Sequence, residues 1–238
     1  MTTAIIVQAR MGSKRLPGKV MAKIGDRTAI AHVLDRCLSV PGIDHVGAAI
    51  PNTLENEPLA DEIRRFGIEP FLGDETDVLG RYVRAVLFYE QMLSTTLDRI
   101  IRITADCPLI DPHVVGQLAS NFSSCDYASN CWPRTYPHGL DCEIFSRDLL
   151  FLAHRKADSE EEREHVTPWM VNHAKKRGNL ENISDMSMLR LTLDYPKDLE
   201  FFRALHSVGW PAFDFFSVIR ALERRPAIAT INQAGAAL

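Results

Sequence analysis

The sequence predicts an α/β fold in which a mostly parallel sheet lies between two layers of helices. In the first half of the chain, short apolar runs alternate with amphipathic segments, and this alternation is typical of parallel strands connected by helices. The 238 residues are 46% hydrophobic and 24% charged, which is enough to bury a core without disulfides. No repeat, linker or low-complexity tract interrupts the chain, so we expect one domain over residues 1–238.

The first half supplies the strands and helices that define the sheet. We expect strands at residues 4–8, 45–50, 70–72 and 99–104, and helices at residues 29–39, 57–66 and 78–89. In the last of these helices the apolar residues recur with the spacing of one helical face. Right-handed crossovers place the loops that follow parallel strands on one edge of the sheet. The loops after Ala9 and Thr104 should therefore meet there.

The second half is less regular. Asp111 followed by Pro112 is typical of a helix N-cap and first helical position, which predicts a helix over residues 111–121. We expect further helices at 147–155, 161–176 and 196–207, and strands at 127–130, 143–145 and 189–193. The segment 131–176 is interpreted as an inserted element that binds substrate or forms a dimer contact. A set of aromatic residues is expected in the core: Phe201, Phe202, Phe213, Phe215 and Phe216.

Charge and cysteine content exclude several classes of protein. A net charge of −4 and a pI near 6.1 argue against a protein that coats nucleic acid. The five cysteines form no CxxC pair, which is typical of reduced thiols. No apolar run approaches the ~20 residues that span a bilayer, and the N-terminus lacks a signal-peptide pattern. We therefore expect a cytoplasmic protein without nucleic-acid or membrane partners.

The most informative segment is the loop that follows the first apolar run. It carries the cations Arg10, Lys14, Arg15 and Lys19 around Gly12. Glycine lets backbone N–H groups approach phosphate oxygens, and Arg and Lys neutralise the phosphate charge. The glycine spacing matches neither the dinucleotide fingerprint nor the P-loop. The loop is predicted to hold a polyphosphate, and the alternative is a solvated basic loop.

Two acids follow predicted strands at the edge where this loop should lie. Asp106 lies just beyond the strand over 99–104, and Asp194 lies just beyond the strand over 189–193. Mg²⁺ in proteins typically takes one or two carboxylates together with phosphate oxygens. The alternative for Asp106 is a cap of the turn before Pro108. The alternative for Asp194 is an N-cap of the helix that begins at Pro196.

Several motifs together resemble one family. The runs QARMGSKRLPGKV, ITADCPLIDP, PHGLDCEIFS, EREHVTP and TLDYPKDLE extend over nearly the whole chain. They resemble the cytidylyltransferase-like branch of the sugar nucleotidyltransferases. That branch includes the CMP-Kdo and CMP-acylneuraminate synthetases, and the likeness is closest to the spore coat polysaccharide biosynthesis nucleotidyltransferases. The resemblance implies a three-layer α/β/α sandwich of the nucleotide-diphospho-sugar transferase (GT-A-like) type.

The resemblance also implies roles for individual residues. Asp106 corresponds to the metal-binding acid of the family, and Asp194 corresponds to a metal ligand of the CMP-Kdo branch. Arg15, Lys19 and Asp106 are expected to be catalytic. The residues expected to bind the nucleotide are Ala9, Arg10, Met11, Gly12, Arg15, Lys19 and Asp106.

A second group of residues is expected to bind the sugar. Gly139, Asp141 and Glu143 alternate in one stretch, so the two acids share a face if it is extended. The alternative is a surface hairpin. Arg163 and His165 lie in the EREHVTP motif and are expected to reach a phosphate or carboxylate of the sugar. The alternative is a solvated first turn of a helix.

The function predicted from these features is Mg²⁺-dependent nucleotidyl transfer for cell-surface polysaccharide biosynthesis. A sugar or sugar-acid oxygen would attack the α-phosphorus of a nucleoside triphosphate, and pyrophosphate would leave. The resemblance favours CTP and leaves a homodimer open. Two alternatives are a glycosyltransferase of the same fold that uses a nucleotide-sugar, and a non-catalytic nucleotide-binding protein.

Overall fold

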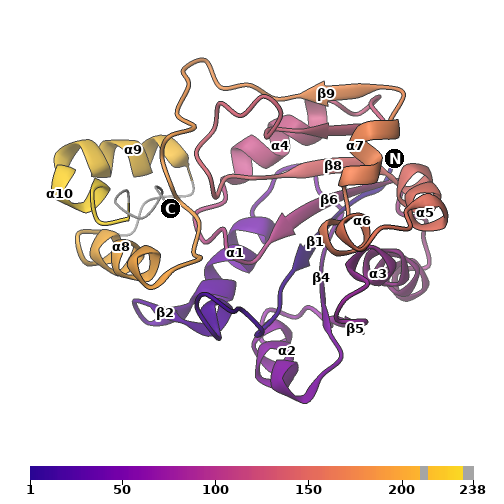
Figure 1. Ribbon diagram of the computed structural model, residues 1–238, viewed down its shortest axis with the longest axis horizontal. Coiled ribbons are helices and arrows are strands. Elements are labelled where there is room, and N and C mark those ends of the chain that lie inside the picture. The colour runs from indigo at the N-terminus through magenta and orange to yellow at the C-terminus, as the bar shows by residue number, and fades with distance from the viewer. Residues whose placement is uncertain (210–213, 233–238) are drawn as a thin grey trace.

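A computed structural model describes residues 1–209 and 214–232. A seven-stranded sheet runs through the middle of the molecule with helices on both faces (Figure 1), which confirms the predicted three-layer fold. In spatial order the strands are β5 (Phe71–Gly73), β4 (His45–Pro51), β1 (Thr3–Gln8), β6 (Arg99–Thr104), β8 (Glu143–Ser146), β7 (Tyr127–Ser129) and β9 (Arg177–Asn179).

The strand order places two loops at the centre of one sheet edge. Strands β5, β4, β1 and β6 are parallel, whereas β8 runs antiparallel to both of its neighbours. The chain first builds outward from β1 to β4 and β5, and then returns to place β6 on the other side of β1. Loops that diverge at such a switch point leave a crevice at the carboxyl ends of the strands.

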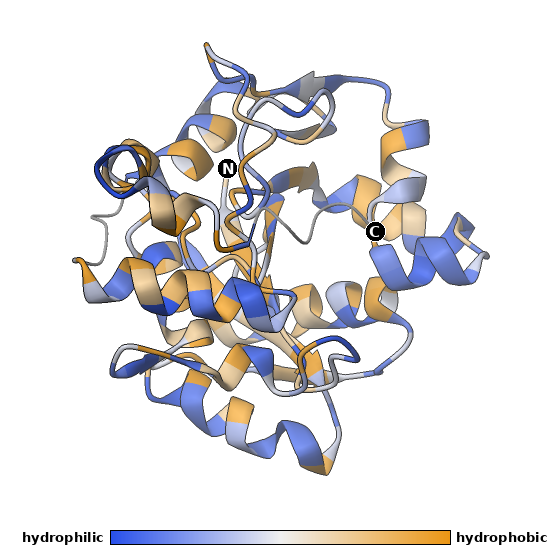
Figure 2. Cartoon of the chain, turned by 60° about the vertical axis from the view of Figure 1, so that its left-hand side comes forward, coloured by the Kyte–Doolittle hydropathy of each residue, from blue (hydrophilic) through white to orange (hydrophobic). Residues whose placement is uncertain are grey.

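The helices form two layers that differ in which half of the core they cover. Buried side chains of α1 (Ala29–Leu38), α2 (Glu57–Arg64), α4 (Pro112–Asn121), α8 (Pro196–Ser207), α9 (Phe215–Arg224) and α10 (Pro226–Ala229) join one hydrophobic core. Those of α3 (Val78–Leu93), α5 (Arg147–Lys156) and α7 (Pro168–His173) join the core on the other face. Along the helices hydrophobic and hydrophilic residues alternate in stripes (Figure 2), as expected for helices with one buried face.

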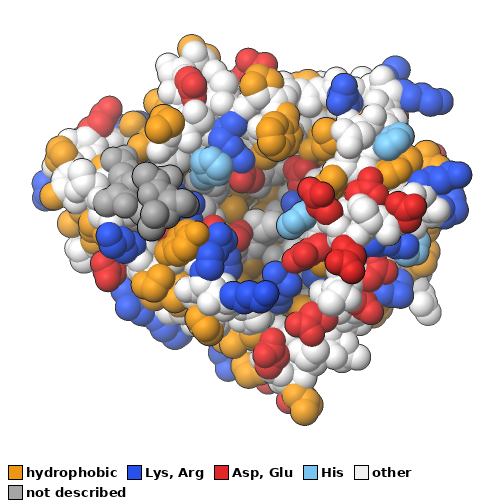
Figure 3. Space-filling model, in the orientation of Figure 1, with side chains coloured by type: hydrophobic (Ala, Val, Ile, Leu, Met, Phe, Trp, Pro, Cys, Tyr) orange, Lys and Arg blue, Asp and Glu red, His pale blue; other side chains and the backbone are white. Residues whose placement is uncertain are grey.

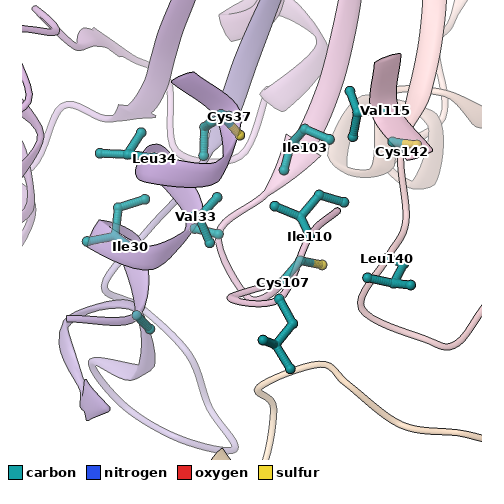
Figure 4. Packing of buried hydrophobic residues seen from close by; sticks show 14 of the residues in the cluster. Ile30, Val33, Leu34, Cys37, Ile103, Cys107, Ile110, Val115, Leu140 and Cys142 are labelled. Atoms are coloured by element: carbon teal, nitrogen blue, oxygen red, sulfur yellow. The ribbon is translucent and has the colours of Figure 1, made fainter. Parts of the chain in front are cut away.

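Alternation along the central strands explains why both faces of the sheet are apolar. Ile5 and Val7 of β1 belong to the core on the α1 side, while Ala4 and Ile6 belong to the core on the α3 side. Each fully buried aliphatic side chain contributes about 1.5–3 kcal/mol. Figure 4 shows the α1 side of the core, where helix side chains lie opposite those of β6 and the following loop: Ile30, Val33, Leu34, Cys37, Ile103, Cys107 and Ile110.

Two predicted elements are wrong. The helix expected over residues 161–176 is broken into α6 (Glu160–His165) and α7, because Val166 has a φ of 70° and Pro168 begins a new helix. The strand expected over residues 189–193 makes only one bridge, between His138 and Arg190. The segment that carries His138 changes direction at the next residue, Gly139, whose φ is 101°. Only glycine fits there, because a Cβ atom would lie 2.1 Å from the carbonyl oxygen of Leu191.

Several elements carry no clear sequence signal. The short hairpin of β2 (Lys23–Ile24) and β3 (Arg27–Thr28), the edge strand β9, and helices α9 and α10 were not expected. Of the aromatic residues predicted for the core, Phe201, Phe202 and Phe215 are buried and Phe216 is 55% exposed. Phe213 lies outside the described residues.

The segment 131–176 is only partly separate from the sheet. Its strand β8 lies between β6 and β7, and its helices α5 and α7 cover one face of the core. A role in substrate binding or dimer formation stays a prediction. Within residues 1–209 and 214–232, no helix has the length and apolar character required to cross a bilayer.

Asp111 joins two helices that are far apart in the sequence. As predicted, it caps α4, since its Oδ1 accepts hydrogen bonds from the backbone N–H groups of His113 (2.7 Å) and Val114 (3.3 Å). Its Oδ2 accepts a third from the N–H of Phe215 at 2.7 Å, at the start of α9. The residue is only 2% exposed, so these donors have little access to water.

Substitution of Asp111 by alanine should lower the free energy of unfolding by about 2–4 kcal/mol, because a helix cap is lost and a buried N–H is left unpaired. Asp214→Ala is the matched control. Asp214 also caps a helix, but its side chain is 33% exposed, so we expect a loss of about 1 kcal/mol. Urea unfolding measures both, and equal losses would contradict the role assigned to Asp111.

Candidate nucleotide-binding site

A cavity of about 850 Å³ opens at the carboxyl ends of β1 and β6. In Figure 3 the molecule is hollowed near the centre of this face, with Lys and Arg on one part of the rim and Asp and Glu on another. The cavity brings together most of the residues predicted to bind nucleotide or metal: Ala9, Arg10, Gly12, Arg15, Lys19, Asp106 and Asp194.

Lys19 lies between the two predicted metal ligands. Its Nζ donates to Asp106 Oδ2 and to Asp194 Oδ1, each at 2.8 Å, and its side chain is only 13% exposed. The loop is closed before it by a hydrogen bond from the N–H of Gly18 to the carbonyl of Met11. Burial alone would lower the pKa of Lys19, but the two carboxylates outweigh it and raise that pKa. Lys19 therefore stays charged.

Asp194 is the most heavily paired acid of the site. Besides Lys19, Arg15 Nη2 lies 2.9 Å from its Oδ1 and Arg190 Nη2 lies 3.1 Å from its Oδ2. Burial would raise the pKa of Asp194, but these cations, Lys19 foremost, outweigh burial and lower it. Asp194 is consequently ionised throughout the neutral range.

Asp198, rather than Asp194, caps helix α8. Its Oδ2 accepts hydrogen bonds from the backbone N–H groups of Asp194 (2.8 Å) and Tyr195 (2.9 Å). Arg190 and Asn232 hold the same carboxylate, and the Asn232 amide donates to Asp198 Oδ1 and to the Arg190 carbonyl, each at 3.1 Å. The capping alternative for Asp194 is therefore wrong, and its carboxylate points instead at the cationic loop.

The segments that carry Asp106 and Asp194 are fastened to each other. The backbone carbonyl of Asp106 accepts hydrogen bonds from the N–H of Leu193 at 2.8 Å and from the hydroxyl of Thr192 at 3.2 Å. The Asp106 carboxylate contacts Lys19 and, more loosely, the Cys107 thiol at 3.6 Å. It is thus not the cap of the turn before Pro108.

These two acids fit a magnesium site that is completed by a ligand. Two carboxylate oxygens from Asp106 and Asp194 approach the same ammonium, and Mg²⁺ needs only one or two carboxylates when phosphate oxygens and waters complete its shell. Among the residues that the structure describes, no group of three or more His, Cys, Asp and Glu side chains could hold a metal. The magnesium role of the pair stays a prediction.

The cationic loop also presents unused backbone donors. Within residues 1–209 and 214–232, the N–H groups of Gly12, Ser13, Lys14 and Arg15 have no hydrogen-bond acceptor, and all four residues line the cavity. Backbone N–H groups without an intramolecular acceptor remain available to hydrogen-bond an anion. The loop therefore offers both charge and directed donors to a polyphosphate.

Other predicted nucleotide contacts differ in position. Arg10 lines the cavity, and its Nη2 lies 3.7 Å from Oε1 of Glu164 in α6. Met11 does not line it, because its side chain packs against the core while its N–H donates to Asn56 Oδ1 at 2.9 Å. Tyr195 closes the loop from the other side, since its ring lies under Arg15 with 4.8 Å from Cζ to the ring centroid.

The residues predicted to bind the sugar lie outside the cavity lining. Gly139 packs against the backbone of Leu191, and Asp141 forms an ion pair with Arg134. Glu143 is buried and accepts hydrogen bonds from Arg102 and Tyr127. Their roles toward a sugar stay predictions.

Arg163 and His165 occupy different environments. Arg163 lines an adjoining recess of about 620 Å³ and lies 3.3 Å from Asp77 Oδ1. His165 is exposed and lines neither cavity. Arg102, Glu75 and Glu164 also line the cavity and were not predicted. Arg102 had a signal as a charge inside a predicted strand, and Glu164 had one because it lies in the EREHVTP motif.

Comparison with known proteins identifies likeness over most of the chain. A protein-family model described as cytidylyltransferase matches residues 4–209. The uncharacterized protein MJ1063 of Methanocaldococcus jannaschii is 34% identical over 95% of this chain and 93% of its own length. The spore coat polysaccharide biosynthesis protein SpsF of Bacillus subtilis is 28% identical over 96% of this chain and 97% of its own. A 3-deoxy-manno-octulosonate cytidylyltransferase of Haemophilus influenzae is 32% identical over 52% of this chain and 46% of its own.

Two solved structures are similar to this chain over most of its length. A cytidylyltransferase from Leptospira borgpetersenii superposes with a TM-score of 0.88 and 28% identity, over 96% of this chain and 97% of that one. CMP:2-keto-3-deoxy-manno-octonic acid synthetase, solved in complex with CTP, superposes with a TM-score of 0.63 and 20% identity, over 87% of this chain and 99% of that one. At that identity the second likeness concerns the fold alone.

The charge of Asp194 should make stability depend on pH in the acid range. Its pKa is lower in the folded protein than its ordinary value of 3.8, so its ion pairs stabilise the fold above that value and are lost as the pH falls through the folded pKa. Asp194→Asn should therefore lower the free energy of unfolding by about 1–3 kcal/mol at pH 7. The difference from wild type should shrink between pH 5 and pH 3, measured by urea unfolding. A difference that stays constant with pH would sink the assignment.

Proposed function

Because this chain belongs to the cytidylyltransferase family, we propose that it transfers the cytidylyl group of CTP to a sugar or sugar acid and releases pyrophosphate. The observation that carries the proposal is the juxtaposition of Lys19 with Asp106 and Asp194 beside the donor-rich loop. A volume of about 850 Å³ lies within the range of small-molecule sites. It is large enough for a nucleotide and part of a second reactant.

In the proposed reaction an oxygen of the acceptor attacks the α-phosphorus of CTP. The bond from that phosphorus to the bridging oxygen of pyrophosphate breaks, and the electron pair leaves with pyrophosphate. Arg15, Lys19 and the free N–H groups of the loop bind the oxygens on which negative charge grows. The attacking oxygen is an anomeric hydroxyl, which loses its proton to water, or an ionised phosphate oxygen of a sugar 1-phosphate, which carries none. Catalysis then comes mainly from positioning and charge neutralisation.

Magnesium is the proposed cofactor, and Asp106 and Asp194 are the residues that would hold it. When bound there, Mg²⁺ would neutralise phosphate charge and orient the triphosphate. Until substrates arrive, Lys19 contacts both carboxylates, and Arg15 and Arg190 supply further positive charge to Asp194. The same ammonium lies in the loop that receives the phosphates.

The names of relatives support the choice of substrates. The similar proteins include cytidylyltransferases for 3-deoxy-manno-octulosonate, a synthetase solved in complex with CTP, and a spore coat polysaccharide biosynthesis protein. By analogy we propose CTP as donor, a sugar or sugar acid as acceptor, and a role in building cell-surface polysaccharide. A homodimer in the cytoplasm is the proposed working form.

Ligand-induced thermal stabilisation tests the donor. A ligand that binds only the folded state raises the melting temperature according to its concentration over its Kd. We expect CTP with Mg²⁺ to raise it more than ATP, GTP, UTP or dTTP, and pyrophosphate to appear once an acceptor is added. Stabilisation by a finished nucleotide-sugar alone would instead favour a glycosyltransferase. CTP binding without pyrophosphate release from any sugar acid or sugar 1-phosphate would favour a non-catalytic protein.

Asp106→Asn tests the metal assignment. We expect Mg²⁺-dependent kcat to fall by about 100-fold or more, because a ligand of the charge-neutralising cation is lost. The melting temperature should change little, since the amide still accepts from Lys19. Asp35→Asn is the control, because Asp35 pairs with Arg27 at 3.0 Å on the exposed side of α1. Near-normal turnover in Asp106→Asn would remove Asp106 from the site.

A further inference from the structure

One cation of the cavity comes from the sheet rather than from the loop. Arg102 of β6 lines the cavity, and its side chain is 16% exposed. Its Nε donates to Gln8 Oε1 at 3.2 Å and its Nη1 donates to Glu143 Oε2 at 2.6 Å. These hydrogen bonds use only part of the donor set of a guanidinium. Donors therefore remain for a ligand in the cavity.

The orientation of Arg102 is fixed by neighbouring strands. Glu143 is its register partner in the antiparallel strand β8, and the other oxygen of Glu143 accepts from the Tyr127 hydroxyl of β7 at 2.6 Å. Gln8 holds it from β1 on the other side. A cation held in place by side chains of three strands is pre-organised, so little side-chain entropy is lost when it binds an anion.

Arg102 remains a cation in spite of its surroundings. Burial would lower its pKa, but Glu143 and the other neighbours outweigh burial and raise it. The ion pair with Glu143 uses only Nη1 of the guanidinium. The rest of the group remains available in the cavity that Arg102 lines. A bidentate fork of this kind matches the geometry of carboxylate and phosphate groups.

The supports of Arg102 lie mostly on the other half of the sheet from the loop cations. Arg10, Arg15 and Lys19 belong to the loop that leaves β1, whereas Glu143 and Tyr127 belong to β8 and β7. The cavity is thus lined by positive charge from two sources, the loop after β1 and Arg102 of β6. A nucleoside triphosphate on the loop would occupy only the first of them.

We infer that Arg102 binds the anionic group of the acceptor, a carboxylate or a phosphate monoester, and so selects acidic over neutral sugars. The inference rests on the proposed function and deepens it. A neutral sugar offers Arg102 only hydroxyl oxygens, whose hydrogen bonds to a guanidinium are weaker than the charge-assisted ones of a carboxylate or phosphate. Arg102 thus acts in substrate selection, and Glu143 acts as a positioning residue behind it.

The variants must separate anion binding from loss of fold. Arg102→Met alone would leave Glu143 buried without its partner, which is strongly destabilising. The double variant Arg102→Met/Glu143→Gln removes both charges and keeps an acceptor for the Tyr127 hydroxyl. Glu143→Gln alone removes the competing carboxylate and leaves Arg102 in place. Arg27→Met/Asp35→Asn is the matched control, because it removes an ion pair of opposite charges far from the cavity lining.

Calorimetric titration of the full chain measures the outcome in two steps. Each variant is first titrated with CTP in the presence of Mg²⁺, and the CTP-saturated protein is then titrated with inorganic phosphate and, separately, with acetate. We expect at least one anion to bind wild type and the control, to bind about tenfold or more weakly to the double variant, and to bind Glu143→Gln, which keeps the cation, more tightly than the double variant. CTP affinity should stay within about twofold, since the proposed contacts to its phosphates come from the loop and not from Arg102. Preference for acetate indicates a sugar acid, and preference for phosphate indicates a sugar 1-phosphate.

The remaining outcomes overturn the inference. Anion affinity that is unchanged in the double variant, or absent in wild type, would exclude Arg102 as the binding residue. A parallel loss of CTP and anion affinity would assign Arg102 to the nucleotide instead. Failure of wild type to bind CTP would contradict the proposed function and this inference with it, whereas normal CTP binding with anion binding independent of Arg102 overturns this inference alone.

Discussion

The contact of Lys19 with Asp106 and Asp194 is the interaction on which the rest of the site depends. Three segments that are far apart in the sequence meet at one ammonium, at 2.8 Å from each carboxylate. Without that cation, Asp106 would lose the ion pair that balances its charge, while Asp194 would keep those with Arg15 and Arg190. A hydrogen bond from Leu193 to the carbonyl of Asp106 fastens the same segments through the backbone. The shape of the cavity therefore follows from charge balance as well as from topology.

The first half of the fold could be predicted from the sequence because local signals agree with the tertiary structure. Apolar runs mark β1 and β6, and the glycine and cations after β1 mark the loop, so Arg15, Lys19 and Asp106 were expected to meet. The second half depends on contacts that have no local signature. Val166 breaks a helical pattern through a positive φ, which is rare for a β-branched residue. The partner of Arg102 is set by the register of an antiparallel pair, and no spacing in the sequence reveals that register.

The sheet divides the chemistry of the cavity between its two halves. At the end of β1, a loop lines the cavity with cationic side chains and with backbone N–H groups that have no acceptor among the described residues. Strand β6 supplies a further cation, Arg102, which Glu143 of β8 and Tyr127 of β7 support from the neighbouring strands. Binding groups on strands are positioned more accurately than those on loops. In the proposed reaction, discrimination between acceptors would therefore fall to Arg102, while the loop would bind the triphosphate, which is the same for every base.

The family model ends at residue 209, yet Asn232 holds the carboxylate of Asp198 and the carbonyl of Arg190 behind Asp194. Phe215 likewise donates to the buried carboxylate of Asp111. The segment that the family model matches and the set of contacts that holds the acids in place thus have different boundaries. A relative could diverge freely beyond residue 209 only if it found another way to hold Asp198. A substitution at Asn232 would consequently affect the position of Asp198 and Arg190, and through them the charges around Asp194.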